Sequence, residues 1–407
     1  MDCMGSSPRA LTALPSPGEG CVRDFTGTAG LATSHQSLPR ARGTAAEPLL
    51  RVLSWNIERG AALQGVIAAL IAADADVIAL QEVDVQTGRG ATHDPTRHSE
   101  RITLDCAQEI AERAHYPHCL VACEMKLTLG GIMCNAILSR YPLSEARALC
   151  HATQPMRYTE ETTAPGAGNG AWQRTGLRTC AVAVVHSPIG DVQIFSDHFE
   201  MRCGISGRLA QLEDLLRDAE AERGATPMQI IAGDLNTFVG GALKLVPARL
   251  PGSPHRFNDP LVAALGRIGG VSEALLWQHA VLGCAEAEVV GEGGAAVAAD
   301  AVRLAQRAAM ESRAAAAGAA DDWSPRARGG ARFGDPFDAA TEWTFAAKLG
   351  PLALYRQKLD WLLCSERLRV VDRGRGNTDF AASDHAFIWV DVVSTPPLDA
   401  EEEQGEE

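Results

Sequence analysis

Short apolar runs alternate with amphipathic segments along most of the chain. Strands are predicted at Val52–Trp55, Val77–Leu80, Asn135–Ser139, Ala181–His186, Val192–Ser196, Met228–Ala232, Leu359–Cys364 and Phe387–Val393. Two amphipathic helices are predicted from apolar residues that recur at helical spacing. The residues are Leu63, Val66, Ile67, Leu70 and Ile71 in the first helix, and Leu209, Leu212, Leu215, Leu216 and Ala219 in the second. The turn at Pro188–Asp191 predicts a hairpin between the strands on either side of it. This mixture of strands and helices implies layered sheets with outer helices.

Three segments lack this patterning. Residues 1–47 are rich in Gly, Ser, Thr, Pro and Ala, and we expect them to be a disordered extension of a domain spanning residues 48–394. An organellar transit peptide is the alternative for this extension, because it holds four arginines among many hydroxyl groups, although Asp2, Glu19 and Asp24 weaken that interpretation. Sixteen alanines in residues 285–320 predict a surface insertion at about 285–330. Residues 395–407 carry six acidic side chains and no base, which predicts a disordered acidic tail.

Composition narrows the class of protein. Hydrophobic residues make up 46% of the 407, as in globular proteins, and the apolar runs are far shorter than the ~18 residues of a membrane span. The eleven cysteines form no C-x-x-C pair, and their odd number excludes a fully paired disulfide framework. We therefore expect an intracellular monomer of the cytoplasm or nucleus. A net charge of -14 argues against a protein that coats nucleic acid, but not against an enzyme that uses a divalent cation to meet phosphate.

Chemically active side chains recur at the ends of the predicted strands. They are Asn56, Glu82, His198, Asp234, Asn236, Asp360, Asp384 and His385. Each has a structural alternative, since Asn56 suits a helix N-cap and Asp234-Leu235-Asn236 an Asx-turn, and a lone histidine is commonly an ordinary loop residue. Their recurrence at one end of several strands favours a site, because that edge of a layered α/β fold is where ligands bind.

Six short motifs surround these residues in a fixed order. They are Leu53-Ser54-Trp55-Asn56-Ile57, Leu80-Gln81-Glu82-Val83, Asn135-Ala136-Ile137-Leu138-Ser139-Arg140, Gly233-Asp234-Leu235-Asn236, Lys358-Leu359-Asp360-Trp361 and Ser383-Asp384-His385. Together, over roughly residues 50–393, they resemble the endonuclease/exonuclease/phosphatase superfamily, which includes deoxyribonuclease I, inositol polyphosphate phosphatases, neutral sphingomyelinases and tyrosyl-DNA phosphodiesterases. The resemblance implies an α/β (α+β) fold, a deoxyribonuclease I-like four-layer sandwich of two packed β-sheets flanked by helices.

The resemblance also implies a division of roles. It assigns Mg²⁺, or Mn²⁺ in its place, to Asn56, Glu82 and Asp384, whose oxygen ligands suit such a cation. The resemblance assigns catalysis to five other residues. Asp234 and Asn236 orient the attacking water, and His385 and His198 face the phosphate. Asp360 orients the imidazole of His385. These types suit hydrolysis of a phosphoester, which builds charge on phosphate oxygens and on the leaving oxygen.

Local features beyond the motifs leave the branch of the superfamily open. Several branches read T-H-L around the histidine, so that Asp197 and Phe199 on either side of His198 are departures. Arg174 and Arg178 precede a predicted strand and are candidates for clamping a substrate phosphate, with plain surface charge as the alternative. The aromatic residues of Thr341–Phe345 either stack on a substrate or anchor a loop.

Two functions follow from these observations. The first is a divalent-metal-dependent phosphoesterase, of nuclease or phosphodiesterase type, in which a water assisted by the metal and the histidines attacks a phosphodiester or phosphomonoester. The second is a catalytically silent binding or scaffold protein on the same fold. The substrate stays open among a nucleic-acid end, a nucleotide, and a phospholipid or inositol phosphate.

Overall fold

The computed structural model describes residues 16, 18–25, 42–44, 47–85, 105–127, 131–152, 154, 174–201, 203–237, 273–274, 277, 333–338, 341–349 and 352–395. The predicted Ala-rich insertion at about 285–330 and the predicted acidic tail, apart from Thr395, lie outside these residues.

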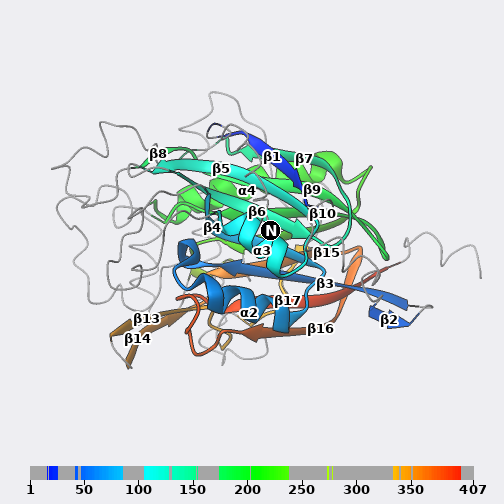
Figure 1. Cartoon of the computed structure of the whole chain (residues 1–407). Helices are drawn as coiled ribbons and strands as arrows, with labels where there is room; N and C mark the ends of the chain where they lie inside the picture. The colour runs from blue at the N-terminus through cyan, green and yellow to red at the C-terminus, as the bar shows by residue number, and fades with distance from the viewer. Residues whose placement is uncertain are drawn as a thin grey trace, which may run out of the picture.

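The first of two large sheets contains nine strands (Figure 1). Its main path follows the order β1, β5, β6, β4, β3, β17, β16, with β2 paired to β3 and β8 paired to β5. The pairing of β3 with β4 is parallel and the others are antiparallel. The strands are β1 (Gly20–Asp24), β2 (Arg42–Thr44), β3 (Glu47–Asn56), β4 (Val77–Val85), β5 (His118–Leu127), β6 (Ile132–Ser139), β8 (Arg174–Gly176), β16 (Leu368–Gly376) and β17 (Phe387–Ser394).

The second sheet contains six strands in the order β12, β15, β11, β10, β9, β7. Here β10 and β11 are parallel, and the predicted hairpin is confirmed as the antiparallel pair of β9 and β10. The strands are β7 (Leu143–Cys150), β9 (Thr179–Ser187), β10 (Gly190–His198), β11 (Met228–Asp234), β12 (Phe333–Gly334) and β15 (Asp360–Ser365). A separate two-stranded ribbon is formed by β13 (Phe345–Leu349) and β14 (Leu352–Gln357).

Helices cover the outer faces of both sheets. The short η1 (Glu58–Gly60), α2 (Leu63–Ala73) and α3 (Cys106–Arg113) follow or flank the first sheet, and α4 (Ile205–Glu222) belongs to the second. In Figure 1, α2 and α3 lie in front of the sheets, and the green α4 lies behind them. None of the helices in the described residues is both long and apolar enough to cross a membrane.

Three apolar clusters fill the spaces between these layers. The first joins α2 and α3 to the first sheet, the second lies between the two sheets, and the third joins the second sheet to α4. Alternate residues of β3 serve different clusters, since Leu53 and Trp55 belong to the first and Leu50 and Val52 to the second. The side chains of a strand point alternately to opposite faces, so a strand between two layers needs apolar residues at both parities. The predicted α+β fold, a sandwich of two packed sheets between helices, is confirmed.

Part of the amino-terminal extension, predicted to be disordered, forms a strand. The composition of residues 1–47 predicts disorder, yet Gly20–Asp24 forms β1 and pairs in register with His118–Ala122 of β5. Phe25 is buried in the first apolar cluster, and Arg23 donates to Asp105 at 2.5 Å. As an edge strand β1 needs only alternate positions to be covered, and its exposed and half-covered residues alternate accordingly. Such a strand carries too little apolar character for a hydrophobic pattern to reveal it.

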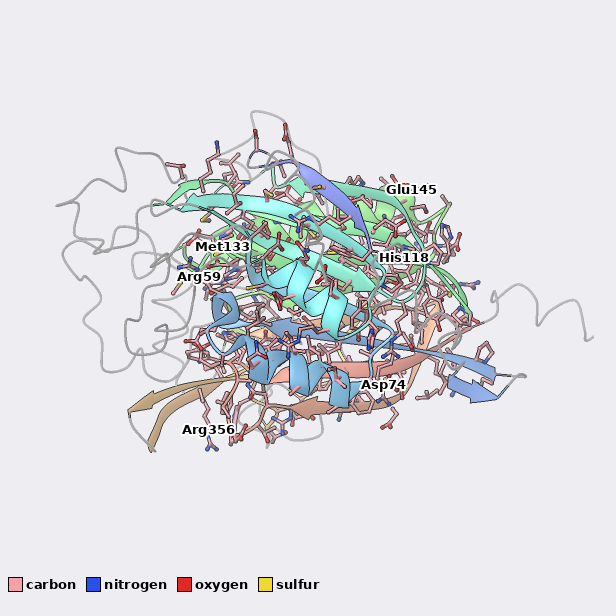
Figure 2. The ribbon with its side chains drawn as sticks, viewed as in Figure 1. Arg59, Asp74, His118, Met133, Glu145 and Arg356 are labelled. Carbon is pink, nitrogen blue, oxygen red and sulfur yellow. The ribbon has the colours of Figure 1, made fainter. Side chains whose placement is uncertain are left out.

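In Figure 2, the labelled Asp74 at the end of α2 and Arg356 on β14 are exposed side chains. Every strand and both helices predicted from the apolar pattern are present, most of them within longer elements, and the strand predicted at Leu359–Cys364 is shifted by one residue to Asp360–Ser365.

Candidate active site

Strands of both sheets end at a common edge, where the predicted residues gather. In the second sheet His198 is opposite Asp234, and Asp234 is opposite Asp360, so the ends of β10, β11 and β15 bring these three side by side. From the first sheet, the Nδ2 of Asn56 donates to Oδ2 of Asp234 at 3.0 Å. This hydrogen bond ties the two sheets together at the site.

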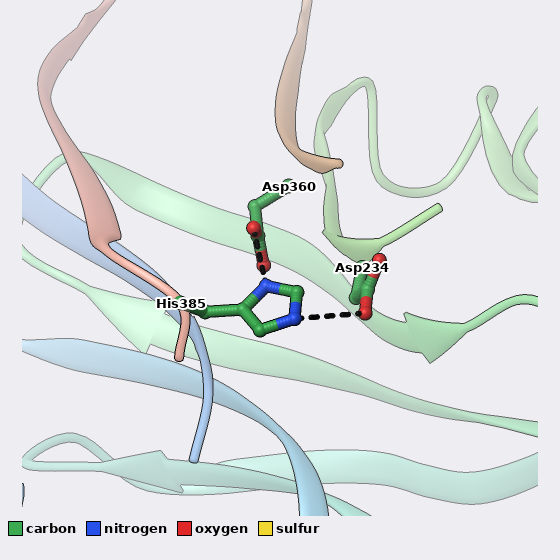
Figure 3. Close-up of side chains that lie close together, drawn as sticks. All are labelled: Asp234, Asp360 and His385. Atoms are coloured by element: carbon green, nitrogen blue, oxygen red, sulfur yellow. Dashed lines mark hydrogen bonds and ion pairs between the residues drawn. The ribbon is translucent and has the colours of Figure 1, made fainter. Parts of the chain in front are cut away.

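An aspartate–histidine pair stands at the centre of this edge (Figure 3). Oδ2 of Asp360 lies 2.8 Å from Nδ1 of His385, and Nε2 of the same ring lies 3.7 Å from Oδ2 of Asp234. Burial alone would lower the pKa of His385, but the carboxylates of Asp360 and Asp234 outweigh it and raise this pKa well above its usual value. The contacts with Asp360 and Asp234 therefore favour the protonated form of the ring.

The backbone around Asp360 and His385 is fixed by its own hydrogen bonds. Oγ1 of Thr344 accepts the N–H groups of both Leu359 and Asp360 at 2.9 Å. The hydroxyl of Ser383 accepts the N–H of His385 and donates to the carbonyl of Asn56. Each partner of the aspartate–histidine pair is thus anchored independently, which keeps the ring in one orientation.

Asp234 is crowded by other charges. Its pKa is raised to about 7, chiefly by burial, with the imidazolium of His385 opposing the rise and Asp360 adding to it. Its other oxygen, Oδ1, accepts the backbone N–H of Asn236 at 3.0 Å, which is the Asx-turn that the sequence left as an alternative. Asn236 has a φ of 51° and donates its amide to the carbonyl of Phe199. The turn therefore serves the site rather than replacing it, because it aims Oδ2 at His385.

A glycine makes room for this arrangement. Gly233 has a φ of 154°, and a Cβ at this position would overlap the carbonyl oxygen of Asp197 on the neighbouring strand. The close approach of β10 and β11 at the site depends on the missing side chain.

Glu82 lies on an irregularity of β4. The register between β4 and β6 shifts between Leu80 and Val83, and Glu82 has a φ of 54°. A bulge of this kind redirects a side chain that a regular strand would hold elsewhere. Oε1 of Glu82 lies 3.9 Å from Nε2 of His198, which in turn lies 3.7 Å from Oδ2 of Asp234. Glu82 is 24% exposed, so its carboxylate can meet a group from solvent.

The carboxylates of the site suit a divalent cation. Contacts of less than 4 Å link Glu82, His198, Asp234, His385, Asp360 and Asp384. Carboxylate oxygens are hard ligands of the kind that Mg²⁺ and Mn²⁺ prefer. Within the described residues, one group has ligand atoms all within 4.8 Å of one another, and it consists of Asp234, Asp360 and His385. The 2.8 Å hydrogen bond inside this group already engages Asp360 and His385 with each other.

The sequence predicted a different ligand set, and its members surround this centre. Asp384 is 40% exposed, with Oδ1 3.9 Å from Nε2 of His385. Oδ1 of Asn56 accepts the N–H of Glu58 at 3.0 Å, which fixes the direction of its remaining lone pair. Asn56, Glu82 and Asp384 thus each lie beside a residue of the central group or its neighbour His198.

One of the two arginines expected to clamp phosphate, Arg178, differs from that expectation. Arg178 is 1% exposed, and its guanidinium lies between Glu124 at 3.4 Å and Glu200 at 3.3 Å. The expectation of an outward clamp is therefore wrong for this structure, because the two buried carboxylates hold Arg178 inside the protein. Arg174 begins β8, but its side chain lies outside what the structure describes.

The aromatic stretch Thr341–Phe345 reaches the site. Phe345 packs on the ring of His385, with the two centroids 5.2 Å apart. Trp343 remains 38% exposed, so burial does not account for it.

Two buried ion pairs next to the site were missed by the sequence analysis. Arg59 forms a two-pronged pair with Asp84 at 2.9 and 2.8 Å, which joins η1 to β4 beside Glu82. His151, directly after β7, is in contact with Asp197 at 2.8 Å. Each partner is an ordinary charged or polar residue in the sequence, and only the departure at Asp197 marked this region.

Fold and site together define a class, the α+β sandwich hydrolases that act on phosphoester bonds. The chain belongs to the Endonuclease/Exonuclease/phosphatase family, whose model matches residues 53–385. No curated protein sequence matches the chain.

Solved structures of low sequence identity are similar to the chain, and the first of those that follow shares its fold. An endonuclease/exonuclease/phosphatase from Beutenbergia cavernae DSM 12333 is 17% identical, with a TM-score of 0.50, and the match covers 85% of this chain and 72% of that one. A family member from Bacteroides vulgatus is 11% identical (85% and 99% covered, TM-score 0.47). TDP2 from D. rerio, solved with a single-strand DNA product, is 14% identical (85% and 99% covered, TM-score 0.41).

Proposed function

We propose that the protein is a divalent-metal-dependent phosphoesterase in which His198, Asp234, Asn236, Asp360 and His385 act on the scissile phosphate. The observation that carries this proposal is the unbroken line of contacts from Glu82 through His198, Asp234 and His385 to Asp360. A scaffold would have no need to hold two imidazoles and three carboxylates, mostly buried, within 4 Å of their neighbours, because such crowding is costly to fold.

Each residue has a role that follows from its surroundings. Asp360 holds Nδ1–H of His385, so that Nε2–H points toward Asp234 and the substrate position, where it can donate to a phosphate oxygen. Asp234 and Asn236, joined by their Asx-turn, orient the attacking water. His198, on the opposite side of Asp234, faces the phosphate or its leaving oxygen.

The metal has candidate ligands at one side of this arrangement. Glu82, Asn56 and Asp384 would hold Mg²⁺ or Mn²⁺ through oxygen atoms. When bound, the cation supplies a positive charge that stabilises the charge developing on the phosphate oxygens. The partly exposed carboxylates of Glu82 and Asp384 allow it to enter from solvent.

Hydrolysis of bis-(p-nitrophenyl) phosphate, a general phosphodiester, tests the function before the natural substrate is identified. Activity should require Mg²⁺ or Mn²⁺, be abolished by EDTA and return when the cation is restored. Glu82→Ala and His385→Ala should each lower turnover by at least ~10². His186→Ala, at an exposed imidazole on the far end of β9, is the matched control and should be unchanged. If the wild-type protein shows only background release here and with every substrate of the panel below, the catalytically silent alternative is correct.

The substrate itself is then identified by a panel. Plasmid DNA, single-stranded RNA, a 5′-tyrosyl oligonucleotide, inositol phosphates and sphingomyelin represent the candidate classes. The substrate whose turnover is lost in both variants is the one used at this site.

A further inference from the structure

A second histidine lies behind the site and has no part in the proposed chemistry. The side chain of His151 is fully buried, and each of its ring nitrogens faces a carboxylate. Nε2 lies 2.8 Å from Oδ2 of Asp197 on β10, and Nδ1 lies 3.6 Å from Oδ2 of Asp214 on α4. The carboxylate at 2.8 Å and the second carboxylate at 3.6 Å favour the doubly protonated, positively charged form of the ring.

Asp197 connects this ring to the catalytic histidine. While Oδ2 contacts His151, the other oxygen, Oδ1, accepts the backbone N–H of His198 at 2.7 Å. The carbonyl of Asp197 is packed against Gly233, so that the residue is fixed from three sides. The backbone position of His198 is therefore set by a carboxylate whose own orientation depends on His151.

The residue on the other side of His198 contacts the same ring. Phe199 meets His151 edge to face, with ring centroids 5.6 Å apart and planes at 86°. Its N–H donates to the carbonyl of Asp234 at 3.0 Å. Asp197 and Phe199 are the two positions at which the sequence departs from T-H-L, and both side chains touch His151. One buried imidazolium thus accounts for both departures.

We propose that His151 is a positioning residue for His198, acting through Asp197 and Phe199, which it holds on either side of that residue. The proposal rests on the proposed function, because it takes His198 to act on the phosphate. If His151 loses its charge, Asp197 is left as a buried carboxylate facing a neutral group. Asp197 must then take up a proton or turn toward another donor, and the N–H of His198 loses its acceptor.

A double-mutant cycle separates positioning from a general structural role. Turnover of bis-(p-nitrophenyl) phosphate is measured for the wild type, His151→Gln, His198→Ala and the double variant. His151→Gln should lower kcat roughly 10- to 100-fold with KM within about twofold, since small displacements of a reacting group have effects of this order. In the His198→Ala background, the same change should have no further effect. An equal fall in both backgrounds would overturn the proposal, as would unchanged activity of His151→Gln.

Two further variants serve as controls. His186→Gln breaks the same kind of histidine–aspartate contact, also 2.8 Å long, at the protein surface, and it should leave kcat unchanged. The combination of His151→Gln with Asp197→Asn removes both charges of the pair and keeps an oxygen that can accept the N–H of His198. It should recover most of the activity that His151→Gln loses. Failure to recover any would contradict a role through Asp197.

The test remains decisive if a variant fails to fold or the protein lacks activity. Asp214→Asn, on α4, removes the second carboxylate of His151 and should give a smaller fall in kcat that again requires His198. If the wild type hydrolyses nothing, the proposed function fails by itself. The coupling is then measured by ¹⁵N–¹H NMR of the imidazole rings, where the His198 signals, identified by their loss in His198→Ala, should shift in His151→Gln but not in His186→Gln. Unshifted signals would overturn the positioning role.

Discussion

The buried pair of His151 and Asp197 predicts a specific dependence of stability on pH. Burial alone would lower the pKa of His151, but Asp197 and Asp214 outweigh burial and raise this pKa from 6.5 to about 9. Since the folded state holds the proton more tightly than the unfolded state, the stabilisation is complete below about pH 6.5 and is lost as the pH rises through about 9. A difference of ~2.5 pH units at ~1.36 kcal/mol each gives about 3 kcal/mol.

The measurement compares the free energy of unfolding of the wild type with that of His151→Gln. Urea unfolding followed by tryptophan fluorescence should show the wild type more stable by about 3 kcal/mol near pH 6, and the difference should fall close to zero near pH 10. Cys180 is another titratable group that faces Asp197, and burial raises the pKa of its thiol well above the usual value, which favours the neutral form. Comparison of the two proteins at each pH cancels the titration of more distant groups.

The exposed His186–Asp191 pair provides the control for this experiment. Its side chains are 43% and 57% exposed, so His186→Gln should change the unfolding free energy by less than ~0.5 kcal/mol at either pH. A wild-type advantage over His151→Gln that stays the same at both pH values would refute the reasoning. In that case His151 would stabilise the protein through its shape and not through its charge.

Two more predictions concern the other buried pairs of the site. Asp360→Asn should lower kcat roughly 10- to 100-fold. It should also move the alkaline limb of the pH–rate profile to lower pH, because Asp360 helps to raise the pKa of His385. An alkaline limb at the wild-type pH would contradict this role of Asp360. Arg59→Met should lower the free energy of unfolding by about 3–5 kcal/mol, because it leaves the fully buried carboxylate of Asp84 without its guanidinium partner. Arg369→Met removes a partner from a pair that is more than half exposed, so it should lower this free energy by less than ~1 kcal/mol. Thermal unfolding of the two arginine variants side by side would show equal shifts if burial did not matter.

The sequence predicted the site residues that directly follow or end a strand. Asp234 directly follows a buried run, and the parallel pairing of β10 with β11 brings His198 beside it, as an edge of strand ends requires. The environment of Arg178 could not be predicted, because its partners Glu124 and Glu200 are distant in the chain and no local pattern links them. The same holds for His151, whose two carboxylates lie on β10 and α4. The periodicity of apolar residues predicts which face of a helix or strand is buried. It does not predict which charged side chain of another element contacts that face.

The strand β1 has a consequence for any shortened form of the protein. The family match begins at residue 53, whereas β1 at Gly20–Asp24 occupies the outer edge of the first sheet and satisfies the hydrogen-bonding groups of β5. A version trimmed to residues 47–394, from the start of β3 to the end of β17, would leave His118–Ala122 of β5 open along that edge, and an open edge is a template for pairing with another chain. Such a protein would tend to associate in solution. The segment that contains β1 therefore protects the sheet edge from association with other chains. A protein expressed for enzymology should include this segment.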